Sequence, residues 1–95
     1  MPFYFYVIRS LIDGSYYKGQ TNDLADRMKR HNEGRSSFTK AKRPWKLVYS
    51  EVYETRSEAV KRESYLKSPK GWMDWQALRN ELEVQIENSE RGAAR

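Results

Sequence analysis

The start of the chain combines a run of large side chains with a turn signal, and this pattern predicts two paired β-strands. Residues 3–9 carry large side chains on both faces, as expected for a strand that is covered on each side. Asp13-Gly14 predicts a tight turn, because glycine accepts a positive φ without strain. Residues 15–21 then return as the second strand, so a β-hairpin opens the fold.

The register of this hairpin decides which side chains share a face of the sheet. With Asp13 and Gly14 as the two central turn residues, Ile8 would lie opposite Gly19. A looser loop over residues 9–14 would instead bring Tyr6 opposite Tyr17. Because strand side chains alternate between the two faces, both registers place Tyr6 and Tyr17 on the same face.

Beyond the hairpin, the sequence predicts a helix, a basic loop and a third strand. Asn22-Asp23 supplies an N-cap for a helix that runs to about Asn32, and Gly34 would end it. Residues 34–44 form a polar, basic loop. A third strand is then predicted by large side chains at every second position, namely Trp45, Leu47 and Tyr49.

Two further helices are predicted in the C-terminal half. Thr55-Arg56-Ser57-Glu58 forms a capping box, and its helix would carry Glu63 on an inner stripe with Ala59 and Leu66. Residues 68–71 break this helix. A third, amphipathic helix follows from apolar residues at three- or four-residue intervals, namely Trp72, Trp75, Leu78, Leu82 and Ile86. We expect a single domain over residues 1–87 and a disordered tail over residues 88–95, which are polar and small.

Composition narrows the class of protein. The chain has 95 residues and no cysteine, which excludes disulfides, thiolate metal sites and a cysteine nucleophile. Its single histidine cannot supply the ligands of a structural zinc site. The longest apolar run, residues 3–8, is too short to cross a membrane, and Met1-Pro2 lacks the features of a signal peptide. We therefore expect a cytoplasmic protein without a membrane partner, and no motif for a nucleotide cofactor occurs.

Charge is unevenly distributed along the chain. The net charge is +5, and residues 29–46 hold seven Lys or Arg against one acid, Glu33. Such a segment suits a polyanionic partner, because contacts to phosphates release bound counterions. The loop within it could equally be an ordinary solvated surface. The residues that we expect to contact nucleic acid are Lys18, Arg35, Lys40, Lys42 and Arg43.

Five side chains are candidates for chemistry on a phosphodiester. Tyr6 and Tyr17 share a face, although tyrosines in strands more often serve packing. Arg27 and His31 lie four residues apart on the first helix, and an arginine suits phosphate because its planar fork donates two parallel hydrogen bonds. His31 could orient water, accept a proton or cap the helix. Glu63 on an inner stripe needs a partner, either Lys67 or Arg62 beside it or a divalent ion, unless its charged head leans out to solvent.

The order of these elements resembles the GIY-YIG nuclease domain over roughly residues 3–71. The similar pieces are Tyr-Val-Ile-Arg-Ser, Asp-Gly-Ser-Tyr-Tyr, Gly-Gln-Thr-Asn-Asp-Leu, Arg-Pro-Trp-Lys-Leu-Val-Tyr and the helix with Arg62-Glu63-x-x-Leu66-Lys67. They look closest to the small stand-alone bacterial members. Tyr4-Phe5 replaces the Gly-Ile of the first motif, Lys18 replaces the central Ile of the second, and the late asparagine of the family has no clear match.

The resemblance implies an α/β (α+β) fold with a three-stranded antiparallel sheet flanked by helices. It also implies a metal-dependent endonuclease that hydrolyses phosphodiester bonds of DNA or structured nucleic acid. Tyr6 and Tyr17 match the tyrosines of the two motifs, and either could activate water. Arg27 and His31 match polar residues of the first helix, with Arg27 holding the phosphate. Glu63 matches the ligand of one Mg²⁺ or Mn²⁺ ion, which would stabilise the leaving oxygen.

The same residues leave two other functions open. A catalytically inactive nucleic-acid-binding module would use the basic residues and need no metal ion. A protein-interaction adaptor would use a surface formed by Trp72 and Trp75. The nuclease alone requires Glu63 to lie close to Tyr6 and Tyr17.

Overall fold

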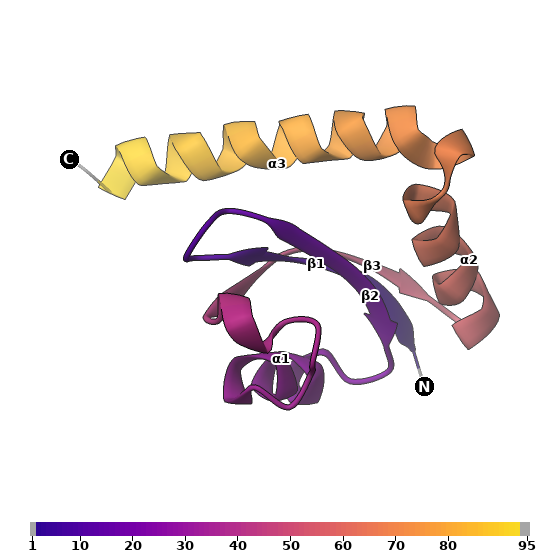
Figure 1. Cartoon of the computed structure of the whole chain (residues 1–95). Coiled ribbons are helices and arrows are strands. Elements are labelled where there is room, and N and C mark those ends of the chain that lie inside the picture. The colour runs from indigo at the N-terminus through magenta and orange to yellow at the C-terminus, as the bar shows by residue number, and fades with distance from the viewer. Residues whose placement is uncertain (1, 94–95) are drawn as a thin grey trace. The chain divides into compact units, whose positions relative to one another are not determined.

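The computed structural model of the chain describes residues 2–93 and contains a three-stranded sheet with helices (Figure 1). The chain divides into two compact units, residues 1–63 and 64–95, and the single domain predicted over residues 1–87 spans both. The first unit holds the sheet, and its strands are ordered β2-β1-β3. All strands are antiparallel to their neighbours, so the fold class predicted from the sequence is confirmed.

The hairpin of β1 (Phe3–Ser10) and β2 (Tyr16–Thr21) has a register between the two that we expected. Tyr6 pairs with Gly19 and Ile8 pairs with Tyr17, so both predicted registers are wrong by two residues. A shift by two preserves the face of every side chain. Tyr6 and Tyr17 therefore do share a face, as predicted.

The turn between β1 and β2 spans more residues than Asp13-Gly14, because segments that are distant in the sequence hold it. The hydroxyl of buried Ser10 accepts hydrogen bonds from the backbone nitrogens of Ile12 and Asp13, at 3.1 and 3.4 Å. The same hydroxyl donates to the carbonyl of Lys42 at 2.8 Å, and the nitrogen of Leu11 donates to the carbonyl of Pro44 at 2.9 Å. The contacts to Lys42 and Pro44 span more than 30 residues of sequence, so the turn propensity of Asp13-Gly14 alone could not reveal them.

The third strand, β3 (Trp45–Tyr53), lies where the sequence predicted it but does not keep one face throughout. Its pairing with β1 is interrupted between Val7 and Ile8, where Val7 faces Tyr49 and Ile8 faces Leu47. This β-bulge inserts one residue and reverses the alternation. Leu47 packs with Ile8, whereas the ring of Tyr49 meets Phe5 on the other face, so the expected common face of Leu47 and Tyr49 is wrong.

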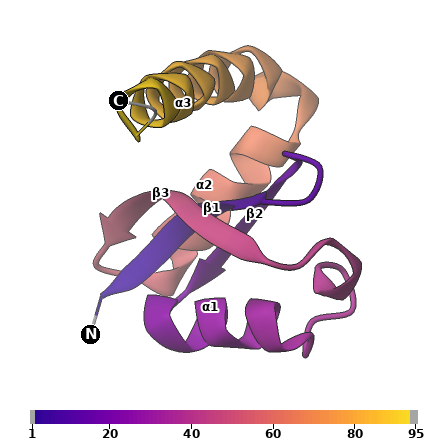
Figure 2. The ribbon, with the colours of Figure 1, turned by 90° about the vertical axis from the view of Figure 1, so that its left-hand side faces the viewer.

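Helix α1 (Leu24–Glu33) lies along one face of the sheet (Figure 2). Asp23 caps it by accepting a hydrogen bond from the nitrogen of Asp26 at 3.0 Å, and Gly34 ends it with a φ of 80°. Leu24 and Met28 pack against the core of that face, which is formed by Tyr6, Ile8 and Trp45. Both ends and the packed side of the helix agree with the sequence prediction.

A two-pronged hydrogen bond joins the end of α1 to the start of β3. The amide of Asn32 donates to the carbonyl of Trp45 at 3.1 Å and accepts from its nitrogen at 2.6 Å. The short 3₁₀ helix η1 (Lys40–Lys42) lies in the intervening loop. The end of α1 and the start of β3 are thus held in a defined relation, and the loop between them forms one side of the site described below.

Helix α2 (Arg56–Lys67) begins with the predicted capping box. The nitrogen of Glu58 donates to the hydroxyl of Thr55 at 3.2 Å, and the carboxylate of Glu58 accepts from the nitrogen of Thr55 at 3.2 Å. Ala59 and Leu66 are buried, and Glu63 is half-buried, so the inner stripe is confirmed.

The second unit contains the 3₁₀ helix η2 (Pro69–Gly71) and helix α3 (Trp72–Ala93). The predicted tail is helical as far as Ala93, and residues 94–95 lie outside the described part of the chain. Trp75 is buried but Trp72 is 58% exposed, so the two rings do not form one exposed surface of the kind an adaptor would use. Among residues 2–93, no helix is long and apolar enough to cross a membrane.

Candidate active site

The phenol of Tyr6 is the most enclosed part of the site, and Gly19 makes room for it. Tyr6 is fully buried on β1 and pairs with Gly19 on β2. A Cβ atom at Gly19 would lie 2.5 Å from the Tyr6 hydroxyl oxygen and 2.6 Å from Cζ, well inside van der Waals contact. Glycine is therefore needed because the backbone of β2 passes close to the phenol ring.

A buried hydrogen-bonded chain runs from Tyr6 through His31 to Thr39. The Tyr6 hydroxyl lies 2.9 Å from His31 Nε2, and His31 Nδ1 lies 2.8 Å from the hydroxyl of Thr39. His31 and Thr39 are both buried, and the indole of Trp45 donates to the carbonyl of Thr39 at 2.8 Å. Both ring nitrogens of His31 are thus engaged within the protein, which excludes it as a metal ligand in this arrangement.

Arg27 influences the ionisation of both Tyr6 and His31. Its positive charge lowers the pKa of the Tyr6 phenol, because it favours the ionised form. Burial, with a smaller contribution from the charge of Arg27, lowers the pKa of His31 below its usual 6.5 and keeps the ring neutral.

The electrostatics of Tyr6 show that the predicted residues gather around it. Burial raises the pKa of Tyr6 well above its usual 10, and the nearby Tyr17 and Glu63 raise it further. The charge and hydrogen bond of Arg27 act in the opposite direction. These four residues come from β1, β2, α1 and α2, so the tertiary fold brings together side chains that are widely separated along the chain.

An arginine-lined pocket of about 310 Å³ adjoins Tyr17. Three arginines contribute to its wall, and two of them are held by neighbouring acids: Arg30 pairs with Asp26 at 3.0 Å and Arg35 with Glu33 at 2.7 Å. The residues that line the pocket are Tyr17, Arg27, Arg30, His31, Arg35, Ser36 and Ser37. The ring of Tyr17 meets that of His31 edge-on, with the ring centres 5.2 Å apart.

Sequence reasoning missed two residues of this region. Arg30 was not among the candidates, although it follows Arg27 by three residues and such pairs lie side by side on a helix. Thr39 lies in a loop without periodicity, so no local signal marks it as the partner of His31. Among the residues predicted to contact nucleic acid, Arg35 lines the pocket.

The remaining basic candidates lie elsewhere. Lys18 pairs with Val7, and alternation along β2 directs it to the face opposite Tyr17. Lys42 forms an ion pair with Asp13 at 3.2 Å, and Arg43 donates from Nε to the carbonyl of Lys40 at 2.8 Å. Of the five basic candidates Lys18, Arg35, Lys40, Lys42 and Arg43, only Arg35 lines the pocket.

The donor set around Glu63 limits which ion it could hold. Among the residues that the structure describes, no three His, Cys, Asp or Glu side chains are grouped as metal ligands. A single half-buried carboxylate suits Mg²⁺ or Mn²⁺, because Mg²⁺ commonly binds one or two carboxylates and keeps waters or phosphate oxygens as its other ligands.

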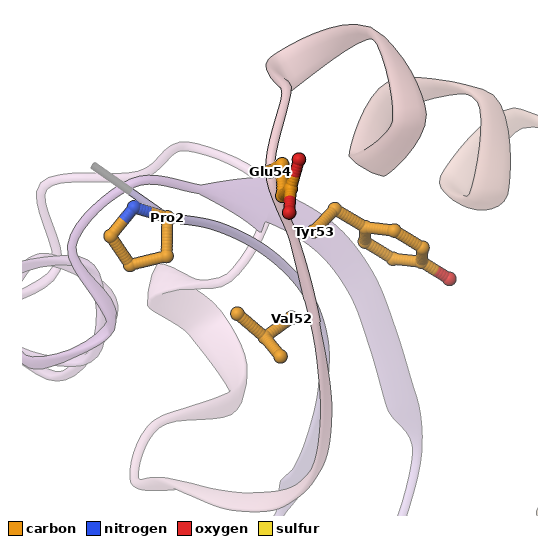
Figure 3. A pocket seen from close by; sticks show the side chains of 4 residues that line it. All are labelled: Pro2, Val52, Tyr53 and Glu54. Atoms are coloured by element: carbon orange, nitrogen blue, oxygen red, sulfur yellow. The ribbon is translucent and has the colours of Figure 1, made fainter.

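A second hollow, of about 500 Å³, lies at the end of β3 (Figure 3). It is lined by Pro2, Val52, Tyr53 and Glu54. None of the candidate residues is among these four. The arginine-lined pocket therefore remains the better candidate for a substrate site.

Comparison with known proteins shows the family of this chain. The model of the GIY-YIG catalytic domain matches residues 2–74. UPF0213 proteins of Staphylococcus aureus strains Mu3 and Mu50 are each 45% identical over 69 residues, which cover 72% of this chain and 84% of theirs. The solution structure of a UPF0213 protein from Bacillus halodurans is 30% identical, with a TM-score of 0.48 over 82% of this chain and 85% of that one. The chain belongs to the GIY-YIG family.

Proposed function

We propose that this protein is a divalent-metal-dependent endonuclease that hydrolyses phosphodiester bonds of DNA or structured nucleic acid. The observation that carries the proposal is the pocket in which Tyr17, Arg27 and His31 meet. The charges of Arg27 and Glu63 also both act on the pKa of Tyr6. The family supports a nuclease-type activity, because its members share a GIY-YIG catalytic domain. The metal ion and the substrate are the parts that this proposal adds.

Arg27 is the proposed phosphate-binding residue. Arg27 lines the pocket and lies near enough to Tyr6 for its charge to lower the pKa of that phenol. A planar guanidinium can give two parallel hydrogen bonds to the non-bridging oxygens of a phosphate, and its charge offsets the negative charge that develops during hydrolysis. A lysine at this position would supply the charge without that geometry.

Tyr17 is the proposed contact to the attacking water. It is half-buried and lines the pocket, whereas Tyr6 is fully buried and its hydroxyl is hydrogen-bonded to His31. A base must be within hydrogen-bond reach of the water from which it takes a proton, and this favours the more accessible phenol. Tyr6, His31 and Thr39 then act as positioning residues that hold Arg27 and Tyr17 in place.

Glu63 is the proposed ligand of the metal ion. When bound, the ion supplies positive charge to the phosphate and stabilises the leaving oxygen. The carboxylate lies near enough to Tyr6 to raise the pKa of that phenol, which supports a place for Glu63 in the same site.

The proposal is tested by a cleavage assay on plasmid and oligonucleotide substrates, with Mg²⁺, Mn²⁺ or excess chelator. We expect cleavage by the wild-type protein that the chelator abolishes. Glu63→Ala, Tyr17→Phe and Arg27→Ala should each lose about 100-fold or more, as expected for groups that act on the reacting phosphate. Glu54→Ala is the matched control, because Glu54 is exposed and lines a different hollow, and it should cleave like wild type.

Two results would contradict the proposal in different ways. If all three variants cut like wild type, the assigned site is wrong. Salt-dependent binding without cleavage under any divalent ion, unaffected by Glu63→Ala, would instead identify a catalytically inactive binding module.

A further inference from the structure

One apolar side chain beside the arginine-lined pocket has no packing role. Phe38 is 84% exposed, the highest value among the large hydrophobic side chains that are exposed in the described part of the chain. It directly follows Ser36 and Ser37, which line the pocket. An isolated exposed apolar residue needs no explanation by itself, but this one adjoins a cationic pocket.

The backbone that presents Phe38 is held on its C-terminal side. Thr39, the next residue, is buried, and its hydroxyl contacts His31 Nδ1 while its carbonyl accepts from the indole of Trp45. The nitrogens of Thr39 and Lys40 donate to the carbonyl of Ser36 at 3.2 and 3.0 Å, which closes a turn around Phe38. The ring is thus displayed from a fixed turn rather than from a free loop, so little ordering cost would be added when it contacts a ligand.

We propose that this turn and the pocket form a nucleotide subsite, in which the arginines hold a backbone phosphate and Phe38 stacks on an unpaired base of the same strand. Arg30 and Arg35 extend the cationic wall beyond Arg27, and the hydroxyls of Ser36 and Ser37 are further donors. Cationic grooves combined with exposed aromatic rings are the arrangement by which proteins bind single strands with little sequence preference.

The subsite rests on the proposed function and narrows the class of nucleic acid that the protein would cleave. A base can reach the face of an exposed phenyl ring only if it is not stacked within a duplex. The preferred substrate is therefore a nucleic acid with an unpaired nucleotide next to the phosphate that Arg27 binds. A regular duplex would contact the arginines but not Phe38.

The test measures binding without cleavage, by fluorescence anisotropy of a labelled single-stranded oligonucleotide in excess chelator. Phe38→Ala should weaken binding about 5- to 150-fold, the range expected for the loss of one stacked base. Phe38→Trp should bind at least as tightly as wild type. Val52→Ala is the matched control, because Val52 is an exposed apolar residue on β3 and 65% exposed, and it should have no effect.

A set of oligonucleotides with one abasic position identifies the contact. For the wild-type protein, one abasic position should weaken binding as much as Phe38→Ala does, and the same oligonucleotide should show no further loss with Phe38→Ala. Arg30→Gln and Arg35→Gln should each reduce the salt dependence of binding, because each removes about one phosphate contact. A duplex of the same sequence should bind wild type and Phe38→Ala alike.

The outcomes separate this inference from the nuclease proposal. If Phe38→Ala binds within twofold of wild type while the protein still cleaves, the subsite is wrong and the nuclease stands. If Phe38→Ala loses affinity for the intact strand alone, but no divalent ion supports cleavage, the subsite stands and the nuclease is wrong. Equal losses on the intact and the abasic strands would also overturn the stacking contact.

Discussion

Two tyrosine clusters lie on opposite faces of the same sheet, and they differ in whether their hydrogen bonds are closed. On the face of α1, Tyr6, His31 and Thr39 form a neutral chain that begins at Arg27 and the pocket. On the other face, Glu51 is the centre of a closed cluster. Its carboxylate accepts hydrogen bonds from three side chains, at 2.5 to 3.2 Å: Tyr49, Tyr53 and Arg62.

The difference indicates separate purposes for similar residues. In the Glu51 cluster the negative charge is matched by the two-pronged contact of Arg62, and this ties α2 to β3. Arg62 immediately precedes Glu63, so the cluster also fixes where the proposed metal ligand lies. On the face of Tyr6, Arg27 lines an open pocket. The closed cluster holds the scaffold in place, and the open one is available to a ligand.

Removing the centre of the closed cluster should have the largest effect on stability. Glu51→Ala leaves Arg62 and two phenols without their acceptor, where the side chains of Glu51 and Arg62 are only 19% and 32% exposed. We expect a loss of about 2–3 kcal/mol in the free energy of unfolding, somewhat below the range for fully buried pairs. Urea denaturation measures it, and Glu54→Ala should stay within about 0.5 kcal/mol of wild type. A loss that small for Glu51→Ala would show that the cluster does not hold α2.

Deleting one hydroxyl from each cluster should cause smaller losses of stability, and these losses should differ between the two clusters. Tyr6→Phe leaves the buried Nε2 of His31 without a partner, which should cost about 1–3 kcal/mol. Tyr49→Phe should cost only about 0.5–1.5 kcal/mol, because Glu51 keeps its bonds from Tyr53 and Arg62. Chemical denaturation of both variants under one condition tests the order, and a reversed order would contradict the distinction between open and closed clusters.

The two clusters should also stop contributing to the free energy of unfolding in different pH ranges. The pKa of His31 is lowered from 6.5, by burial and then by Arg27, so the unfolded chain takes up the proton first as pH falls. The contribution of His31 is therefore complete above about pH 6.5 and is lost on acidification below it. For Glu51, burial would raise the pKa, but hydrogen bonds from Arg62 and the two tyrosines outweigh it and lower the pKa from 4.5. The stabilisation by Glu51 is therefore complete above about pH 4.5 and is lost as the pH falls below that value.

Unfolding midpoints measured from pH 7 to pH 3.5 separate these ranges. His31→Gln should remove the decline of the unfolding midpoint between pH 6.5 and about 5, because the chain has no other histidine. Tyr49→Phe, which leaves His31 in place, is the matched control and should retain that decline. A His31→Gln protein with an undiminished decline in this range would show that His31 is not the group responsible.

Local signals in the sequence predicted most of the fold correctly. The cap at Asp23, the stop at Gly34 and the capping box at Thr55 and Glu58 depend on residues within three or four positions of one another. The hairpin was located, but its register was wrong because Ser10 is held by Lys42 across 32 residues. The face of Tyr49 was wrong because the β-bulge responds to pairing with β1, which no local pattern records.

The sequence by itself determined which elements form and that Tyr6 and Tyr17 share a face, because caps, turns and alternation act between near neighbours. It also named Tyr17, Arg27 and Glu63 from their order and spacing. Only the tertiary structure decided that His31 would be buried between Tyr6 and Thr39, 25 and 8 residues away. Such a chain depends on the packing of α1 against the sheet. Its physical cause is the need of each buried polar group for a partner, wherever in the sequence that partner lies.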